Sequence, residues 1–70
     1  MIWIVDEAKS ESYQIVGTNI HQTEKGCELW ATRSNGKTIK LIASEDCNEV
    51  SEFKEAIDYA VASGAQAFKI

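Results

Sequence analysis

The sequence predicts an α+β fold in which a small, mainly antiparallel sheet of four or five strands carries one helix on one face. Three observations support this prediction. Short segments of alternating apolar and polar residues fill the first part of the chain, and one long amphipathic segment follows them. Asn35-Gly36 separates two of the alternating segments and is a strong signal for a tight hairpin turn. A last apolar segment completes the expected order β-β-β-β-α-β.

Size and composition indicate one domain spanning residues 1–70. The apolar fraction of 44% and the charged fraction of 26% are those of ordinary globular proteins, so disorder is not expected. The chain contains no proline and no linker-like segment that would separate two domains. A chain this short buries only about 60% of its extended surface, and such domains often gain stability from a disulfide, a metal or a partner.

Two strands are expected before the central hairpin, at Met1–Val5 and Tyr13–His21. The first is apolar on both sides, and a polar segment follows it. In the second, the alternation of apolar residues changes phase at Gly17. A change of phase at a glycine is typical of a β-bulge or a bend, which we expect at this position.

The hairpin around Asn35-Gly36 joins predicted strands at Cys27–Arg33 and Lys37–Ala43. Their alternation separates two faces. The face expected against the helix carries Leu29, Ala31, Ile39 and Leu41. The opposite face is expected to carry Trp30, Thr32, Thr38, Lys40 and Ile42, together with Val16 and Ile20 of the preceding strand.

The segment Glu49–Ser63 predicts an amphipathic helix. At about 100° per residue, its apolar residues fall on one stripe. They recur at spacings of 3, 4, 3 and 1, at Val50, Phe53, Ile57, Ala60 and Val61.

Both ends of this helix have recognisable signals. Ser44, Asp46 and Asn48 are all suitable N-caps, and Asp46 followed by Glu49 resembles a capping box. Gly64 is a natural residue just beyond the C-terminus. The tail Ala65–Ile70 is expected to form a short strand beside a neighbour of the strand that precedes the helix, or beside the N-terminal strand.

The net charge of −4 and the pI of about 4.8 disfavour nucleic acid, whose binding depends on Lys and Arg neutralising phosphates. The seven basic residues still permit a local cluster. An acidic chain is better suited to protein partners, including basic ones.

We expect a cytoplasmic protein in which both cysteines are reduced. Cys27 and Cys47 lie 20 residues apart, which permits one disulfide, but no secretion signal precedes them. Met1–Val5 lacks a basic flank and is too short for a signal peptide or a membrane span. A membrane partner is therefore not expected.

No catalytic or metal-binding pattern is present, so we expect neither an enzyme nor a cofactor. His21, Cys27 and Cys47 follow one another at spacings of 6 and 20 residues, which match no zinc pattern. No histidine adjoins Cys47 in sequence to form a catalytic pair. The chain also lacks a glycine-rich phosphate loop, because its four glycines are explained by turns, a bulge and a helix cap.

Trp30 is the most informative residue of the expected outer face. The indole is either half-covered by its neighbours, with Lys40 across its ring, or a hot-spot residue of a protein interface. A third interpretation is a platform on which nucleic-acid bases stack. Because large apolar groups are seldom left open to water, we expect a binding surface that includes Trp30, Thr32, Lys40 and Ile42.

Tyr59 lies on the polar side of the predicted helix, near Glu52 and Glu55. It either covers the helix surface or contacts a partner. The carboxylates around it are either a solvated face or a surface that attracts a basic protein.

The function that we expect is that of a small acidic, non-enzymatic protein-interaction module. It would bind a partner or form a homodimer through the outer sheet face and the acidic helix. Compact acidic chains without an active site are typical of phage or mobile-element inhibitors and accessory proteins. The alternative is a nucleic-acid-binding domain that uses the outer face around Trp30, Arg33 and Lys40, because the order of elements resembles that of three-stranded DNA-binding domains.

Overall fold

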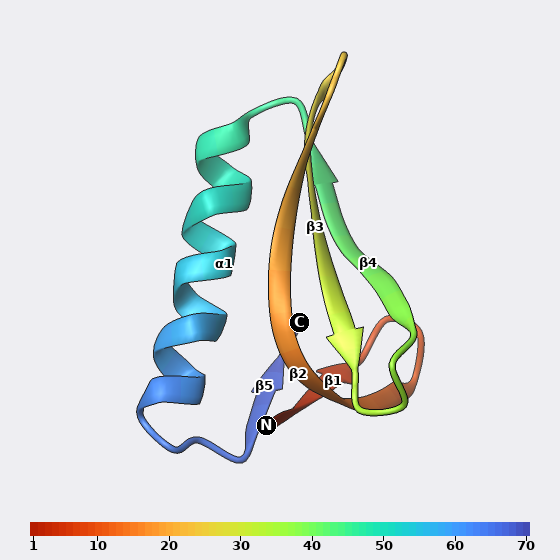
Figure 1. Ribbon diagram of the computed structural model, residues 1–70, viewed down its shortest axis with the longest axis vertical. Helices are drawn as coiled ribbons and strands as arrows, with labels where there is room; N and C mark the ends of the chain where they lie inside the picture. Colours follow the sequence, from red (N-terminus) through yellow and green to blue (C-terminus); the bar gives the residue numbers. More distant parts are fainter.

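The computed structural model describes residues 1–70 as a five-stranded sheet with one helix packed on one face (Figure 1). This confirms the predicted α+β fold and the predicted order of elements. The elements are β1 (Ile2–Asp6), β2 (Glu11–Thr23), β3 (Gly26–Arg33), β4 (Thr38–Ser44), α1 (Cys47–Ala62) and β5 (Ala67–Lys69).

The strands lie in the order β4-β3-β2-β1-β5. All neighbours are antiparallel except β1 and β5, which are parallel. Of the two positions left open by the sequence, the C-terminal strand therefore takes the one beside the N-terminal strand. Phe68 of β5 packs against Phe53 of α1, with ring centroids 5.9 Å apart in an edge-to-face arrangement.

β2 is the longest strand and belongs to both halves of the sheet. Residues Glu11–Ile15 pair with β1, and the stretch from Ile15 to Thr23 pairs with β3. The register shifts between Ile15 and Gly17, so the expected β-bulge is present and Val16 is the extra residue. Figure 1 shows β2 running from the bottom of the sheet to the hairpin tip at the top, while β1 and β5 lie only beside its lower end.

The bulge changes which side chains of β2 face the helix. Beyond it, Ile20 pairs with the buried Leu29 and packs against the core. The prediction that Ile20 lies on the outer face is therefore wrong. A change of phase was expected, but the extra residue shifts every later side chain by one face.

A second bulge lies in β4, at a position that no glycine or turn residue marks in the sequence. Leu29 pairs with Ile42, whereas the next residue, Trp30, pairs with Lys40, so Leu41 is the extra residue. Ile42 consequently packs against the core on the helix side. The prediction that Ile42 lies on the outer face beside Trp30 is wrong for this reason.

The core lies between α1 and the sheet, and it draws on every element. Val50 and Ile57 of α1 are fully buried, as expected from the apolar stripe. The sheet contributes the remaining buried hydrophobic residues Ile2, Ile4, Tyr13, Ile15, Cys27, Leu29 and Ala31. Val61, which the spacing also assigned to this stripe, remains 41% exposed at the edge of the helix.

The helix begins two residues earlier than predicted, at Cys47, because Asp46 is the N-cap. The Asp46 carboxylate accepts a hydrogen bond from the backbone N–H of Asn48 at 3.0 Å. The Ser44 hydroxyl accepts from the N–H of Asp46 at 3.1 Å and donates to Glu49 at 3.2 Å. The helix ends at Ala62, and Gly64 follows with the positive φ expected of a residue beyond the C-terminus.

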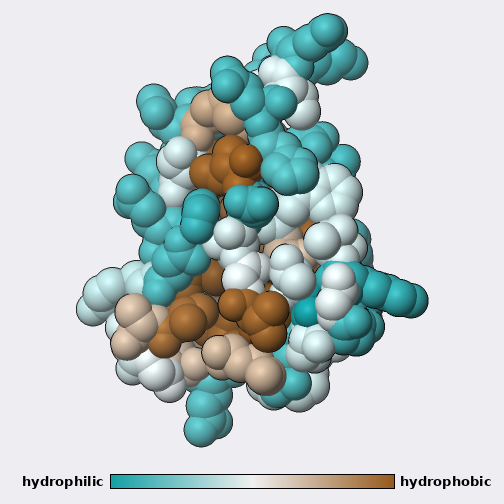
Figure 2. All heavy atoms as spheres, in the orientation of Figure 1, coloured by the Kyte–Doolittle hydropathy of each residue, from teal (hydrophilic) through white to brown (hydrophobic).

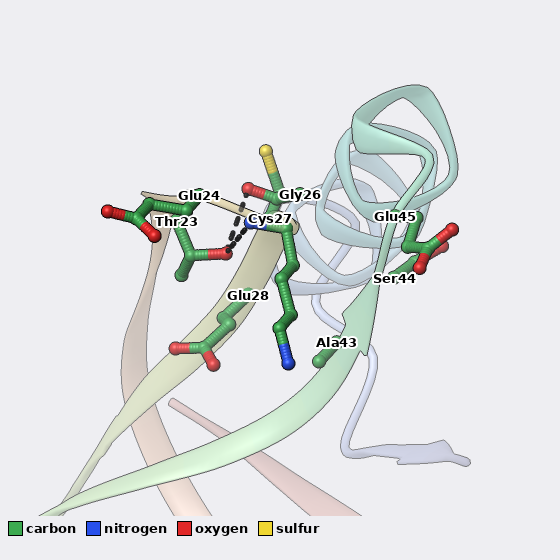
Figure 3. A pocket seen from close by; sticks show the side chains of 9 residues that line it. Thr23, Glu24, Gly26, Cys27, Glu28, Ala43, Ser44 and Glu45 are labelled. Carbon is green, nitrogen blue, oxygen red and sulfur yellow. Dashed lines mark hydrogen bonds between the residues drawn. The ribbon is translucent and has the colours of Figure 1, made fainter.

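Gly26, the first residue of β3, lies against the end of β4 (Figure 3). Its φ is +153°, which residues with side chains rarely adopt. A Cβ atom at this position would lie 2.2 Å from the carbonyl oxygen of Ser44. The close approach of these two backbones therefore requires glycine.

We predict that Gly26→Ala lowers the free energy of unfolding by about 2 kcal/mol or more, through backbone strain and the clash with Ser44. Urea unfolding followed by circular dichroism measures this change. Gly17→Ala is the matched control, since a Cβ at Gly17 meets nothing within 4 Å. Equal stability of the two variants would contradict the prediction.

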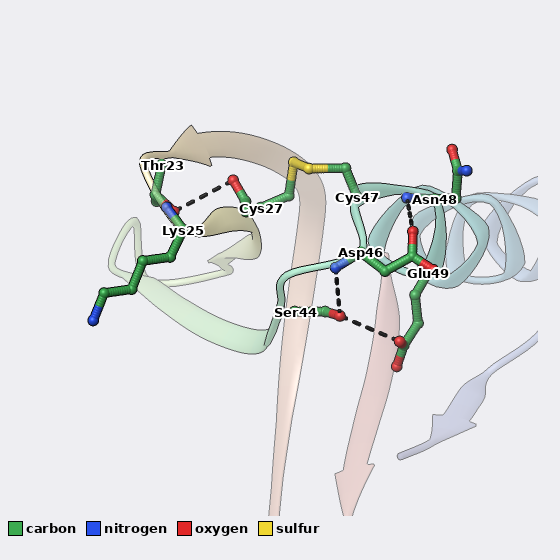
Figure 4. Close-up of a disulfide and its surroundings, with 9 residues drawn as sticks. Thr23, Lys25, Cys27, Ser44, Asp46, Cys47, Asn48 and Glu49 are labelled. Atoms are coloured by element: carbon green, nitrogen blue, oxygen red, sulfur yellow. Dashed lines mark hydrogen bonds between the residues drawn. A yellow bond between two sulfur atoms is a disulfide. The ribbon is translucent and has the colours of Figure 1, made fainter.

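A disulfide joins Cys27 of β3 to Cys47, the first residue of α1 (Figure 4). Their Cα atoms are 5.1 Å apart, which is within the usual range for a disulfide. The prediction that both thiols are reduced is therefore wrong. It rested on the absence of a secretion signal, and the spacing of two cysteines does not reveal that the helix N-terminus returns to the start of β3.

We predict that removing this disulfide lowers the free energy of unfolding by about 3 kcal/mol, the loop-closure value for some 20 residues. The comparison is urea unfolding of the oxidised protein, the protein in reductant, and the double variant Cys27→Ser/Cys47→Ser. Reductant should destabilise the wild type and leave the double variant unchanged. If reductant does not change the free energy of unfolding of the wild type, the presence of the disulfide is contradicted.

Candidate interaction surfaces

The outer face is the side of the sheet opposite α1, and Trp30 of β3 is fixed near its centre. The indole stacks against His21 of β2, with ring centroids 5.9 Å apart and planes at 28°. Its N–H donates a hydrogen bond of 3.1 Å to the carboxylate of Glu28. Glu28 also forms an ion pair with Lys40 at 3.7 Å. The half-buried indole is therefore held in one orientation before any partner binds.

A hollow of about 220 Å³ lies beside the indole on this face. Apart from Trp30, its lining is polar, with one amide, one imidazole and two hydroxyl groups. The lining residues come from three adjacent strands and are Asn19, His21, Trp30, Thr32 and Thr38. An aromatic ring surrounded by donors and acceptors can take the side chain of a partner and hydrogen-bond to its backbone.

The structure brings together four of the predicted outer-face residues, which are Trp30, Thr32, Thr38 and Lys40. Asn19 and His21 were not predicted, because they reach this face only through the bulge at Val16. They replace the expected Ile20 and Ile42, so the outer face is more polar than predicted. If the alternation had been counted from the C-terminal end of the strand, with Ile20 facing the core, Asn19 and His21 would have been placed on the outer face.

Arg33 does not join Trp30 on the outer face. Its guanidinium lies over the ring of Tyr13, 5.3 Å from the centroid, and Tyr13 is a core residue on the helix side. Lys40, the other basic residue of the proposed nucleic-acid surface, is paired with Glu28. The cluster of free positive charge that a nucleic-acid surface needs is therefore not formed around Trp30.

Negative charge is concentrated on and before the helix. From Glu45 to Ala62 there are six acidic residues and one basic residue, a net charge of −5. The rest of the chain has five acidic and six basic residues, a net charge of +1. The basic residue of the helix, Lys54, forms an ion pair with Asp58 at 2.6 Å.

Tyr59, Glu52 and Glu55 all lie on the solvent side of α1, and Tyr59 is 75% exposed. None of the three side chains makes a hydrogen bond or an ion pair within the chain. Because α1 and the outer face lie on opposite sides of the sheet, these residues are separate from Trp30. The predicted site residues thus form two surfaces instead of one.

A third surface was not predicted. It is the groove between β2 and the C-terminal half of α1, with a volume of about 290 Å³. Val16 and Val61 line it and are 55% and 41% exposed. Figure 2 shows apolar atoms gathered on the lower part of this face, with hydrophilic atoms above them. The sequence pattern had placed Val16 on the outer face and Val61 in the core.

The widest hollow, about 530 Å³, lies at the β2–β3 turn (Figure 3). Three carboxylates, Glu24, Glu28 and Glu45, line it together with Lys25. The structure contains no group of three or more His, Cys, Asp and Glu side chains placed to hold a metal ion.

Comparison with protein-family models, curated proteins and solved structures finds no match for this chain. The single helix does not have the length and apolar character needed to cross a membrane.

Burial of Tyr13 raises the pKa of its phenol above the ordinary value of 10.0. The nearby carboxylates of Asp6 and Glu11 raise the pKa further, and the guanidinium of Arg33 opposes them. Tyr13 is a core residue with no hollow beside it, so this shift follows from packing and does not indicate catalysis.

We predict that the wild type loses stability relative to Tyr13→Phe as the pH rises above 10.0, the unfolded pKa of the phenol. In that range the unfolded chain releases the proton before the folded chain does, so unfolding becomes more favourable until the folded pKa is passed. Urea unfolding of both proteins from about pH 8 to about pH 11 measures the difference. If the free energy of unfolding changes with pH in the same way for both proteins, the prediction is contradicted.

Proposed function

We propose that this chain is a non-enzymatic protein-interaction module that binds a protein partner through the outer face around Trp30. The observation that carries the proposal is the indole itself, which lies on the side of the sheet that no element covers. Its stacking on His21 and its hydrogen bond to Glu28 fix its orientation. Binding to a fixed side chain costs less conformational entropy than binding to a mobile one.

The surroundings of the indole support a protein partner. Interface hot spots are enriched in tryptophan and are surrounded by groups that exclude water and contribute little energy themselves. Asn19, Thr32 and Thr38 offer donors and acceptors for such a rim. Trp30 is the single apolar side chain that lines this hollow, which suits a partner that binds and dissociates.

The acidic helix supports a bias towards basic partners. The net charge of −5 from Glu45 to Ala62 attracts positive segments and repels nucleic acid. Tyr59, with Glu52 and Glu55 beside it, is the place on α1 where a basic segment of the partner would dock. This contact is on the opposite side of the molecule from Trp30, so it is a second and separable contribution.

The disulfide gives information on the compartment in which the module is found. Disulfides persist in oxidising environments and are rare in the cytosol, so the Cys27–Cys47 bond weighs against the cytoplasmic location expected from the sequence. Assignment to a phage or mobile element stays a prediction from composition.

We predict that Trp30→Ala weakens partner binding by about thirtyfold or more, the factor that corresponds to about 2 kcal/mol for a hot-spot residue. Partners captured on the immobilised wild type and identified by mass spectrometry would be purified and titrated by calorimetry. Because Trp30 is only half-buried and outside the core cluster, the variant should remain folded.

Trp3→Ala is the matched control. Trp3 is 45% exposed on the same sheet face, but it pairs with Gln14, whereas Trp30 pairs with Asn19. These two β2 residues are separated by about 16 Å at roughly 3.3 Å per residue. A partner that binds wild type, Trp30→Ala and Trp3→Ala equally well would exclude the outer face as the binding site.

A further inference from the structure

β2 has an open edge from Thr18 to Thr23. β1 covers the other end of β2, and its ladder stops where Ile2 pairs with Ile15. Beyond this point β3 lies on one side of β2, and no strand lies on the other. Figure 1 shows β1 and β5 only beside the lower end of β2, while the upper part of β2 runs alongside α1. The open edge can therefore accept one more strand.

The register shows which backbone groups point to this edge. The N–H of Arg33 bonds to Lys37 in the β3–β4 turn, so the groups of the preceding residue, Thr32, point towards β2. Because Thr32 pairs with Gly17, every second residue of β2 from Gly17 onwards bonds to β3. The N–H and C=O groups of the residues between them point into the open edge. These residues are Thr18, Ile20 and Gln22.

The other edges of the sheet are better protected against pairing. β4 carries the bulge at Leu41 in its middle and Lys40 beside it, and β5 is only three residues long. Bulges, edge lysines and short strands are the usual features that prevent the pairing of an edge with another chain. The stretch of β2 beyond Val16 keeps a regular register, so it is the edge best suited to an added strand.

The start of β1 limits the length of an added strand. Ile2 occupies the same edge opposite Ile15, so a strand that runs antiparallel to β2 must end or turn away after the residue opposite Thr18. In the other direction the edge stops at Thr23, where the β2–β3 turn begins. The free stretch accepts about six extended residues, roughly 20 Å at 3.3 Å per residue. The edge is therefore suited to a short segment.

A groove beside this edge can receive the side chains of an added strand. It lies between β2 and α1, has a volume of about 290 Å³, and is lined mainly by apolar groups, including Val16 and Val61. Thr18 and Ile20 point to the helix side, since Thr18 bonds to Asp58 at 3.0 Å and Ile20 packs against the core. Directly opposed side chains of an antiparallel pair lie on the same face. The residue opposite Thr18 therefore points into this groove.

The charge of α1 favours a basic segment at this edge. The stretch from Glu45 to Ala62 has a net charge of −5, so it attracts positive segments and repels negative ones. A second copy of this chain, paired through the same edge, would bring its own α1 to the same side of the sheet. The two acidic helices would then repel each other, which disfavours a second copy as the occupant.

We propose that the open edge of β2 binds a short, basic, extended segment of a partner protein as an additional antiparallel strand. The orientation is that of β1 at the same edge, and antiparallel pairs are slightly more stable than parallel ones. The segment residue opposite Thr18 is apolar and fills the groove between Val16 and Val61. Backbone hydrogen bonds provide affinity, and the groove and the acidic helix provide specificity.

This inference goes beyond the proposed function and does not rest on it, because the open edge and the outer face are different surfaces. The probe is a library of random seven-residue peptides, displayed with a free C-terminus and selected on the immobilised wild type. The enriched peptides should be rich in lysine and arginine, with apolar residues at alternate positions.

The enriched peptides are then synthesised and titrated by calorimetry. Val61→Lys should raise the dissociation constant by about tenfold or more, because it places a charge in the apolar groove. Val16→Lys, at another exposed position of the groove, is the second variant if the first does not fold.

Ala56→Lys is the matched control. It adds the same charge at an exposed position of the same helix, outside the groove, and should change the dissociation constant much less. A library that yields no peptide overturns the proposal. Peptides that bind the groove variants as tightly as they bind Ala56→Lys also overturn it.

Amide hydrogen exchange followed by NMR locates the bound peptide. When peptide is added, exchange at Thr18, Ile20 and Gln22 should slow by about tenfold or more, because these N–H groups acquire partners. Asn19 and His21 already bond to β3 and are the internal controls. Protection that does not alternate along β2 would exclude strand pairing. Protection of the same amides at high protein concentration without peptide would assign the edge to a second copy and overturn the proposal.

Discussion

The β-bulge at Val16 is the constraint on which most of the surface chemistry depends. It turns Thr18 and Ile20 towards α1, and it turns Asn19 and His21 to the outer face. The indole of Trp30 acquires its stacking partner in this way, and Thr18 reaches the Lys54–Asp58 ion pair. A single additional residue in one strand therefore determines which polar groups surround the tryptophan and which line the helix.

Much of the architecture could be predicted from the sequence, because the sequence signals for its turns, helix face and helix cap are local. Asn35-Gly36 determines the β3–β4 turn, the spacing of Val50 and Ile57 determines the buried side of α1, and Asp46 caps the helix, as expected. Each signal involves residues within a few positions of one another. Local preferences of this kind are decided before tertiary contacts form, and here none of them conflicts with the final fold.

The candidate site was less accessible because it depends on register and on long-range contact. The bulge at Leu41 has no glycine or turn residue to mark it, and without it Ile42 would lie beside Trp30. The Cys27–Cys47 bond requires the start of α1 to return to the start of β3, a contact between elements that are separated by a whole hairpin. The placement of Trp30 on the outer face is correct, because three residues of regular alternation from Cys27 suffice to determine it.

The parallel pairing of β5 with β1 has a consequence for how the chain acquires its structure. Val5 and Lys69 are partners in this ladder, so the last strand closes on the first across nearly the whole chain. Contacts this distant in sequence are slow to form because a long loop must close first. During synthesis, the sheet would remain incomplete until Ala67–Lys69 have left the ribosome, and Ile4 and Phe53 would until then lack the covering that Phe68 provides.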